Sequence, residues 1–209
     1  MYYHIEGILS YKDANLCVID CAGVGYKLNI SYTTYSRLPE TGKTVKLFAH
    51  LVVKEDALDL LGFSDLAEKN AFLMLLTISG VGVKVATSVL SVMSPERFAF
   101  AVASGDYKEI AAAHGVSTKT AQKIIIELKD KIDKENIASS KSGGLDSSQY
   151  ISDMSMPAAG NVRGDAIVAL MALGYSRNEA SDALKNVDLS KSLEEIIKLG
   201  LRNLARPMN

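Results

Sequence analysis

Over the first 63 residues, apolar and polar side chains alternate in short runs, as they do in β-strands. Turn-forming residues separate these runs at positions 13–15, 23–25 and 39–42. Several short strands within about 60 residues favour a small closed barrel over an open sheet. We therefore predict a β-barrel at residues 1–63, built mainly from YYHIEGILSY, NLCVIDCAG, GYKLNISY and TVKLFAHLVV.

Between residues 64 and 134 the apolar positions recur every three to four residues, the period of an α-helix. Ser94-Pro95-Glu96 combines a helix-capping residue with a proline at the first helical position, which marks a helix start. This zone predicts four or five short helices.

Residues 135–160 are dominated by Ser and Gly and contain few large apolar side chains, which predicts a flexible linker. Residues 161–209 return to a helical pattern in three pieces, with breaks near 174–176 and 188–190. The fold class is therefore multidomain α+β. A barrel, an all-α central domain, a linker and a three-helix domain follow one another along the chain.

The charges nearly cancel, with 23 basic and 24 acidic residues and a net charge of -1. No zone departs from neutrality by more than about two charges. This balance argues against bulk coating of nucleic acid and against a polybasic membrane binder. No apolar run is long enough to span a membrane and no secretory signal is visible, so we expect a cytoplasmic protein.

The two cysteines, Cys17 and Cys21, are four residues apart in one predicted strand and therefore face the same side. A disulfide at that spacing has poor geometry, and a metal site needs more Cys and His nearby. We predict two reduced, partly buried thiols, with no metal and no cofactor.

Gly42-Lys43-Thr44 resembles the end of a phosphate-binding P-loop, but Arg37 stands where the pattern needs a glycine. A strand-like run follows where a helix is required. Gly23-Val24-Gly25 fails as a dinucleotide motif because position 28 is Leu. Both segments are interpreted as turns, and we expect no ATP hydrolysis by this chain.

The central zone contains a duplicated segment. Residues 75–90, LLTISGVGVKVATSVL, align with residues 110–125, IAAAHGVSTKTAQKII, at an offset of 35. Each copy predicts a helix, a short glycine-containing turn and a second helix. Lys84 and Lys119 occupy the same position near the start of that second helix.

A glycine turn that leads into a helix can aim backbone N–H groups and the positive end of the helix dipole at one point. Phosphate is the natural occupant, and a lysine adds a charged contact. Such contacts reach the nucleic-acid backbone, so binding would follow shape and ignore base sequence. A plain helical hairpin is the alternative. The candidate phosphate-binding residues are Gly80, Gly82, Lys84, Gly115, Ser117, Lys119 and Lys123.

Glu55 and Asp56 lie in a predicted turn, VVKEDAL, between two apolar strands. In an unknown protein this is usually a solvated hairpin tip. A two-carboxylate metal site for phosphodiester cleavage is the alternative, and Asp59 is the nearest third carboxylate.

The order and spacing of these segments resemble the RuvA family of Holliday junction branch migration complex subunits. The resemblance covers essentially the whole chain. It is carried by GVGYKL (23–28), LPETGKTVKLFAHLVVKEDALDLLGF (38–63), GVGVKVA (80–86), KTAQKIIIELKDK (119–131) and VALMALGYSRNEA (168–180).

The resemblance implies an OB-like barrel, a tandem helix-hairpin-helix domain and a C-terminal three-helix domain that is ubiquitin-associated-like. It implies a homotetramer, or an octamer, that holds a four-way DNA junction open without catalysing a reaction. Glu55 and Asp56 would form an acidic pin at the junction centre. The C-terminal domain would bind the hexameric RuvB ATPase motor, and the RuvC resolvase would be a further partner. In the C-terminal domain the candidate motor contacts are Leu170, Met171, Leu173 and Tyr175, with a purely core role as the alternative.

Two positions depart from the family pattern. Ser117 stands where the family usually has a second glycine, and Thr118 stands where a lysine often occurs. Ser117 can still offer an N–H and a hydroxyl. We therefore expect the second hairpin to bind phosphate, with a smaller contribution than the first.

Two other classes of function remain open from the residues. A helix-hairpin-helix DNA repair glycosylase or nuclease would need a catalytic carboxylate, and Asp106 is the nearest candidate. Because Asp106 follows Ser104-Gly105 at an apparent helix start, it suits a helix cap better. A protein-interaction adaptor without DNA contact is the other alternative.

Overall fold

The structure is a computed structural model that describes residues 2–141 and 162–205 of the 209-residue chain. The chain divides into two compact units. The first comprises Met1–Pro95 together with Ala112–Val116, and the second comprises Glu96–Ala111 together with Ser117–Asn209.

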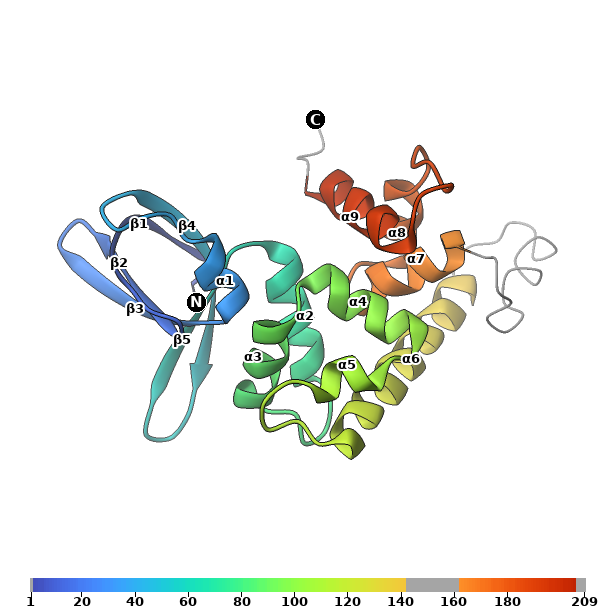
Figure 1. The fold of residues 1–209 in the computed structure, drawn as a ribbon, viewed down its shortest axis with the longest axis horizontal. Helices are drawn as coiled ribbons and strands as arrows, with labels where there is room; N and C mark the ends of the chain where they lie inside the picture. Colours follow the sequence, from blue (N-terminus) through green and yellow to red (C-terminus); the bar gives the residue numbers. More distant parts are fainter. Residues whose placement is uncertain (1, 142–161, 206–209) are drawn as a thin grey trace. The chain divides into compact units, whose positions relative to one another are not determined.

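Five strands form a closed barrel at the N-terminal end of the first unit, which confirms the predicted barrel (Figure 1). The strands follow the order β1-β2-β3-β5-β4, and all neighbours are antiparallel except β3 and β5, which are parallel. Their bounds are β1 His4–Lys12, β2 Leu16–Cys21, β3 Val24–Ile30, β4 Thr44–Val53 and β5 Leu58–Phe63.

The barrel core is built from the alternating apolar positions of these strands. In β2, Cys17 and Ile19 are fully buried, whereas the residues between and beside them are only partly buried. Cys21 packs against the same core, and both cysteines are free thiols. The predicted partial burial holds for Cys21, whereas Cys17 is fully buried because it points into the barrel core. Burial of the Cys17 thiol raises its pKa to about 12, because the thiolate would lose its hydration.

Helix α1, Tyr32–Arg37, connects β3 to β4 and was not expected from the sequence. Ser31 caps it by accepting a hydrogen bond from the Thr34 N–H. The sequence signal was weak because six residues are too few for a repeating apolar pattern.

A buried polar cluster joins α1 to helix α2, Leu66–Leu76. The Glu68 carboxylate is fully buried and accepts hydrogen bonds from the hydroxyls of Ser31, Thr34 and Ser64. The Thr34 bond measures 2.6 Å and the Ser64 bond 3.1 Å. These bonds satisfy a polar group that would otherwise be costly to bury, and they fix α1 on α2.

Helix α3, Val83–Val92, also contacts α1. The Thr33 hydroxyl donates to the Leu90 carbonyl at 2.6 Å, and the Tyr32 N–H donates to the Ser91 hydroxyl at 3.1 Å. The barrel is thereby attached to the α2–α3 hairpin within the first unit.

Five helices occupy residues 64–141, which agrees with the predicted four or five. After α2 and α3 come α4 Pro95–Ser104, α5 Tyr107–Ala111 and α6 Thr118–Lys141. Helix α4 begins directly after Ser94, as the Ser-Pro-Glu pattern predicts. Helix α6 continues past residue 134, where the helical zone was expected to end. The rest of the predicted linker, 142–160, lies outside the described residues.

The C-terminal region contains the three predicted helices, α7 Val162–Ala172, α8 Arg177–Ala183 and α9 Leu193–Leu204. Ser176 with Glu179 and Ser192 with Glu195 form capping boxes that start α8 and α9. Throughout the described part of the chain, no helix has the length and hydrophobicity needed to cross a membrane.

Candidate nucleic-acid interface

The first duplicated segment forms the α2–α3 hairpin, and its turn has a defined backbone. Gly80 has φ of +86°, a conformation that side chains disfavour. The Val81 N–H donates to the Ile78 carbonyl at 3.0 Å, and both side chains are buried. The apolar residues therefore anchor the turn, while Gly80 and Gly82 remain exposed.

The start of α3 is open. Gly82 is the N-cap residue and supplies no side-chain cap. The first helical hydrogen bond of α3 is the one in which the Ala86 N–H donates to the Gly82 carbonyl at 3.0 Å. The N–H groups of residues 83–85 come before this bond and therefore have no acceptor within the helix. The Lys84 side chain in the same turn is exposed. This arrangement can hold an anion.

The second duplicated segment repeats the same backbone geometry. Gly115 has φ of +77°, and the Val116 N–H donates to the Ala113 carbonyl at 3.1 Å. At the start of α6, the Ala121 N–H donates to the Ser117 carbonyl at 2.9 Å. The sequence duplication is therefore a duplication of turn conformation and of helix start.

The two copies differ at the helix cap. The Ser117 hydroxyl accepts a hydrogen bond from the Thr120 N–H at 3.0 Å and is also bonded to the Thr120 hydroxyl at 2.9 Å. One N–H of α6 is thus occupied by the protein itself, whereas its counterpart in α3 has no such cap. Serine at position 117 therefore leaves the backbone geometry unchanged and gives the helix start a side-chain hydrogen bond that Gly82 lacks.

The lysines of the second copy also differ from each other. Lys119 is exposed near the start of α6. Lys123, one turn later, is exposed as well but lies 3.5 Å from the Glu127 carboxylate. The Glu127 carboxylate partly offsets the positive charge of Lys123. Lys119 therefore contributes more positive potential than Lys123 at this helix end.

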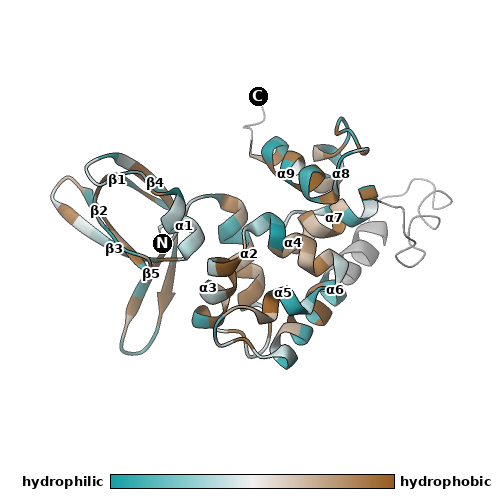
Figure 2. Ribbon diagram, viewed as in Figure 1, coloured by the Kyte–Doolittle hydropathy of each residue, from teal (hydrophilic) through white to brown (hydrophobic). Residues whose placement is uncertain are grey.

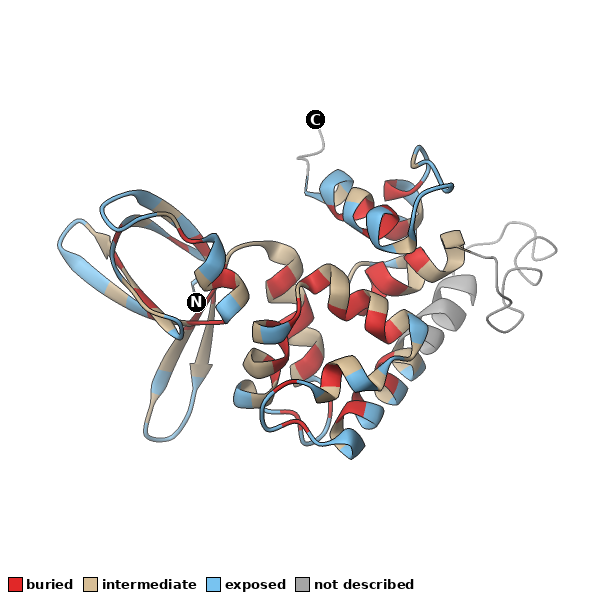
Figure 3. Cartoon of the chain, in the orientation of Figure 1, coloured by how far each residue is buried: buried red, intermediate tan, exposed pale blue. Residues whose placement is uncertain are grey.

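Strands β4 and β5 continue beyond the barrel as a hairpin whose tip is hydrophilic and exposed (Figures 2 and 3). Glu55 and Asp56 are both exposed at this tip, which the Lys54 N–H closes by donating to the Ala57 carbonyl at 2.9 Å. The hairpin therefore presents two carboxylates to solvent on a short, hydrogen-bonded turn.

An ion pair braces the hairpin behind the tip. Lys54 Nζ lies 2.7 Å from Asp59 Oδ2. The hydrogen bond and charge of Asp59 raise the pKa of Lys54, and those of Lys54 lower the pKa of Asp59. The Asp59 carboxylate is thus paired with Lys54 and does not join Glu55 and Asp56 as a third metal ligand. Among the described residues, no group of three or more His, Cys, Asp or Glu side chains could hold a metal ion.

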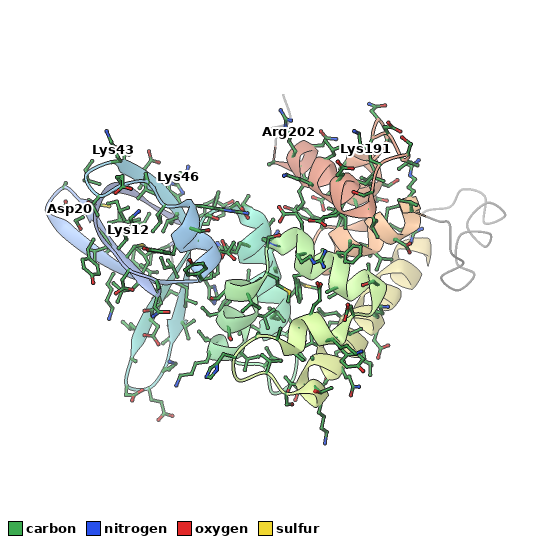
Figure 4. The ribbon with its side chains drawn as sticks, viewed as in Figure 1. Lys12, Asp20, Lys43, Lys46, Lys191 and Arg202 are labelled. Atoms are coloured by element: carbon green, nitrogen blue, oxygen red, sulfur yellow. The ribbon has the colours of Figure 1, made fainter. Side chains whose placement is uncertain are left out.

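The other candidate motifs have structural roles. Lys43 lies on the outside of the barrel in a turn that leads into β4, which confirms the turn interpretation (Figure 4). Asp106 accepts a hydrogen bond from the Lys108 N–H at 3.0 Å at the start of α5. It is a helix cap, as the sequence favoured.

The four candidate motor contacts separate into two groups. Leu170, Met171 and Leu173 are at most 1% exposed and form part of the core of the three-helix region. Tyr175 is partly exposed. Burial therefore favours the core alternative for the first three, and Tyr175 alone of the four reaches the surface.

Sequence reasoning did not identify Ser31, Thr34, Ser64 and Glu68 as a group, although together they hold the barrel on α2. It also did not identify Ser88, whose hydroxyl donates to the His114 carbonyl at 2.7 Å. Ser31 and Thr34 are 37 and 34 residues from Glu68, and Ser88 is 26 residues from His114, whereas Ser64 alone is close to its partner in sequence. No local pattern could have paired the residues that are distant in sequence.

Known protein families match three segments of the chain. Residues 1–62 match the RuvA N terminal domain, residues 72–130 match the SAM-like helix-hairpin-helix tandem, and residues 161–205 match the RuvA C-terminal domain. The second match contains both glycine turns.

Whole-length relatives carry the same name. The chain is 42% identical to the Holliday junction branch migration complex subunit RuvA of Acetivibrio thermocellus, over 99% of this chain and 100% of the relative. It is 41% identical to the protein of that name from Symbiobacterium thermophilum, with the same coverage. A third, from Ruminiclostridium cellulolyticum, is 37% identical over 98% of this chain and its own full length.

Proposed function

The chain belongs to the RuvA family, and from that premise we propose that it binds four-way DNA junctions by their shape. The observation that carries the proposal is the pair of turns at Gly80 and Gly115, which share one backbone conformation and each precede a helix with a lysine near its start. Binding through such turns reaches phosphates and is independent of base sequence.

We assign the phosphate contacts to the two hairpins. In the first, Gly80, Gly82 and Lys84 would hold one phosphate. In the second, Gly115, Ser117, Lys119 and Lys123 would hold another. The open helix start at Gly82 and the self-capped start at Ser117 support a larger contribution from the first hairpin.

We assign the exposed carboxylates of Glu55 and Asp56 to an acidic pin at the junction centre. Their charge would repel phosphates and keep DNA strands from entering the space around the pin. The Lys54–Asp59 ion pair would keep the hairpin straight behind its acidic tip. In this role the carboxylates select a shape of DNA and perform no chemistry.

We propose that the chain is a non-catalytic subunit that recruits the RuvB ATPase for branch migration in recombination and repair. Residues 161–209 would bind the motor, with the partly exposed Tyr175 as the candidate contact. Of the expected linker, 135–160, the part that follows the end of α6 at Lys141 would serve as the linker. Residues 1–63 and 64–134 would form the junction-binding part.

A homotetramer is the expected assembly, and an octamer is the alternative. RuvC would be a further partner. Native mass measurement with and without junction DNA tests the assembly.

The deciding experiment compares the affinities of the purified protein for a four-way junction and for a linear duplex of the same length, at one salt concentration. We expect the junction to bind at least tenfold more tightly. Equal affinities would overturn the proposal. Incubation of the same junction with Mg²⁺ should leave both strands intact, and a nick would favour a nuclease instead.

A further inference from the structure

Ser88 lies in the middle of α3, and its hydroxyl makes an unusual bond for that position. A serine inside a helix commonly donates to a carbonyl of the preceding turn. Ser91 does so to Thr87 at 2.8 Å, and Ser104 does so to Phe100 at 2.9 Å. Ser88 instead donates to the carbonyl of His114, in the turn of the second hairpin, at 2.7 Å.

The accepting carbonyl belongs to the peptide unit that joins His114 to Gly115. A trans peptide unit is planar, with its C=O and N–H pointing in opposite directions. A hydrogen bond that holds the His114 carbonyl toward α3 therefore directs the Gly115 N–H away from α3. Gly115 is the residue with φ of +77° and is exposed, so this N–H belongs to the surface of the turn.

Ser88 also connects the two turns to one rigid element. Helix α3 begins next to the first turn, at Gly82, and Ser88 follows six residues later, about 9 Å along the helix axis. Both turns lie in the same compact unit, as residues 80–82 and 112–116. The Ser88 bond thus attaches the second turn to the helix whose start forms the first.

We propose that Ser88 is a positioning residue that orients the second turn for phosphate and sets its distance from the first turn. This inference rests on the proposed phosphate contacts of the two hairpins. Ser88 itself would not contact DNA. Without its hydroxyl the turn keeps the Val116–Ala113 bond and the buried Val116, so it still forms, but the His114–Gly115 peptide unit is free to rotate.

The first test measures junction affinity of Ser88→Ala, Ser88→Thr and Ser104→Ala by fluorescence anisotropy at fixed salt. Loss of one hydrogen bond predicts about three- to tenfold weaker binding for Ser88→Ala. Ser88→Thr retains a hydroxyl and should restore most of the affinity. Ser104→Ala removes a hydroxyl that bonds within its own helix and should bind like the unchanged protein. Unchanged affinity of Ser88→Ala would overturn the inference.

The second test separates positioning of the second turn from a general loss of structure. Ser88→Ala is combined with Lys119→Ala, in the second hairpin, and with Lys84→Ala, in the first. We expect Ser88→Ala to weaken binding by its full factor in the Lys84→Ala background and by less than twofold in the Lys119→Ala background. Equal factors in both backgrounds would overturn the inference. A wild-type protein that does not prefer the junction would instead overturn the proposed function.

Discussion

The two hairpins share one backbone design and differ most clearly at a single side chain. Gly82 leaves the start of α3 without a side-chain cap, whereas Ser117 bonds the Thr120 N–H at the start of α6. A phosphate at the second site would have to share or displace that bond. Two sites that align in sequence therefore differ in how many N–H groups they offer.

This difference predicts unequal effects when a carboxylate is placed at each cap. Gly82→Asp should weaken junction binding by more than Ser117→Asp, because it removes the open helix start and adds repulsion where the stronger contact lies. Junction affinities measured by anisotropy check the ranking. Asn178→Asp adds the same charge on exposed α8 and should have little effect. Equal losses for the two cap variants would contradict the ranking.

The two thiols predict a second difference between single residues. Cys17 is fully buried and its pKa is raised to about 12, whereas Cys21 is partly exposed. At pH 8 a thiol reagent should label Cys21 readily and Cys17 only after the barrel unfolds. Mass spectrometry of the labelled peptides measures both rates, and Cys21→Ser should leave almost no fast labelling. Rapid labelling of Cys17 in the folded protein would refute its burial.

The raised pKa of Cys17 also determines how this thiol changes the free energy of unfolding as the pH rises. The unfolded thiol titrates near 9.0 and the folded thiol near 12. The contribution of the protonated thiol is therefore complete below pH 9 and is lost as the pH rises from 9 toward 12. Cys17→Ala should reduce this alkaline loss of stability.

At the level of elements, α1 is the connection that makes the barrel and the α2–α3 hairpin one unit. The packing of α1 against α2 depends on the buried Glu68, whose carboxyl oxygens accept hydrogen bonds from three hydroxyls. The acidic hairpin and the first glycine turn belong to the two parts that α1 joins. The position of one relative to the other thus depends on this polar cluster.

Glu68→Ala should destabilise the first unit strongly, because the buried hydroxyls of Ser31 and Thr34 and the partly buried hydroxyl of Ser64 lose their acceptor. We expect a loss of about 3 kcal/mol in the free energy of unfolding, and a smaller loss for Glu68→Gln, which keeps one acceptor oxygen. Urea denaturation followed by circular dichroism measures both. Glu40→Ala removes an exposed carboxylate and serves as the control. A cost below about 1 kcal/mol for Glu68→Ala would show that the cluster contributes little.

The β4–β5 hairpin predicts a change in selectivity more than in affinity. Glu55→Gln combined with Asp56→Asn removes the repulsive charge from the tip and leaves the Lys54–Asp59 brace in place. We expect duplex DNA to bind more tightly and the junction-to-duplex affinity ratio to fall. Competition binding with both DNAs measures the ratio. An unchanged ratio would argue that these carboxylates do not select the DNA shape.

At the scale of the whole molecule, a net charge of -1 is compatible with DNA binding only if few phosphates are held. About two to four contacts per subunit predict a slope of about -2 to -4 in a plot of log affinity against log salt concentration. A salt titration of junction binding, normalised per subunit, checks this value. A much steeper slope would require a broad basic face, which the charge distribution does not provide.

The sequence by itself determined the features that depend on neighbours along the chain. The period-2 runs predicted a closed barrel and the duplicated glycine turns predicted two matching hairpins. The expected breaks near 174–176 and 188–190 separate the three C-terminal helices. Each of these follows from backbone preference and local apolar spacing, which act over only a few residues.

Only the tertiary structure decided which distant groups meet. It placed Glu68 under Ser31 and Thr34, joined Ser88 to His114, and buried Leu170 and its neighbours in the C-terminal core. A carboxylate, a hydroxyl or a leucine has the same local pattern whether it is buried or exposed. Its role is set by the partner that folding brings to it, because hydrogen bonding and desolvation depend on distance in space and not on distance along the chain.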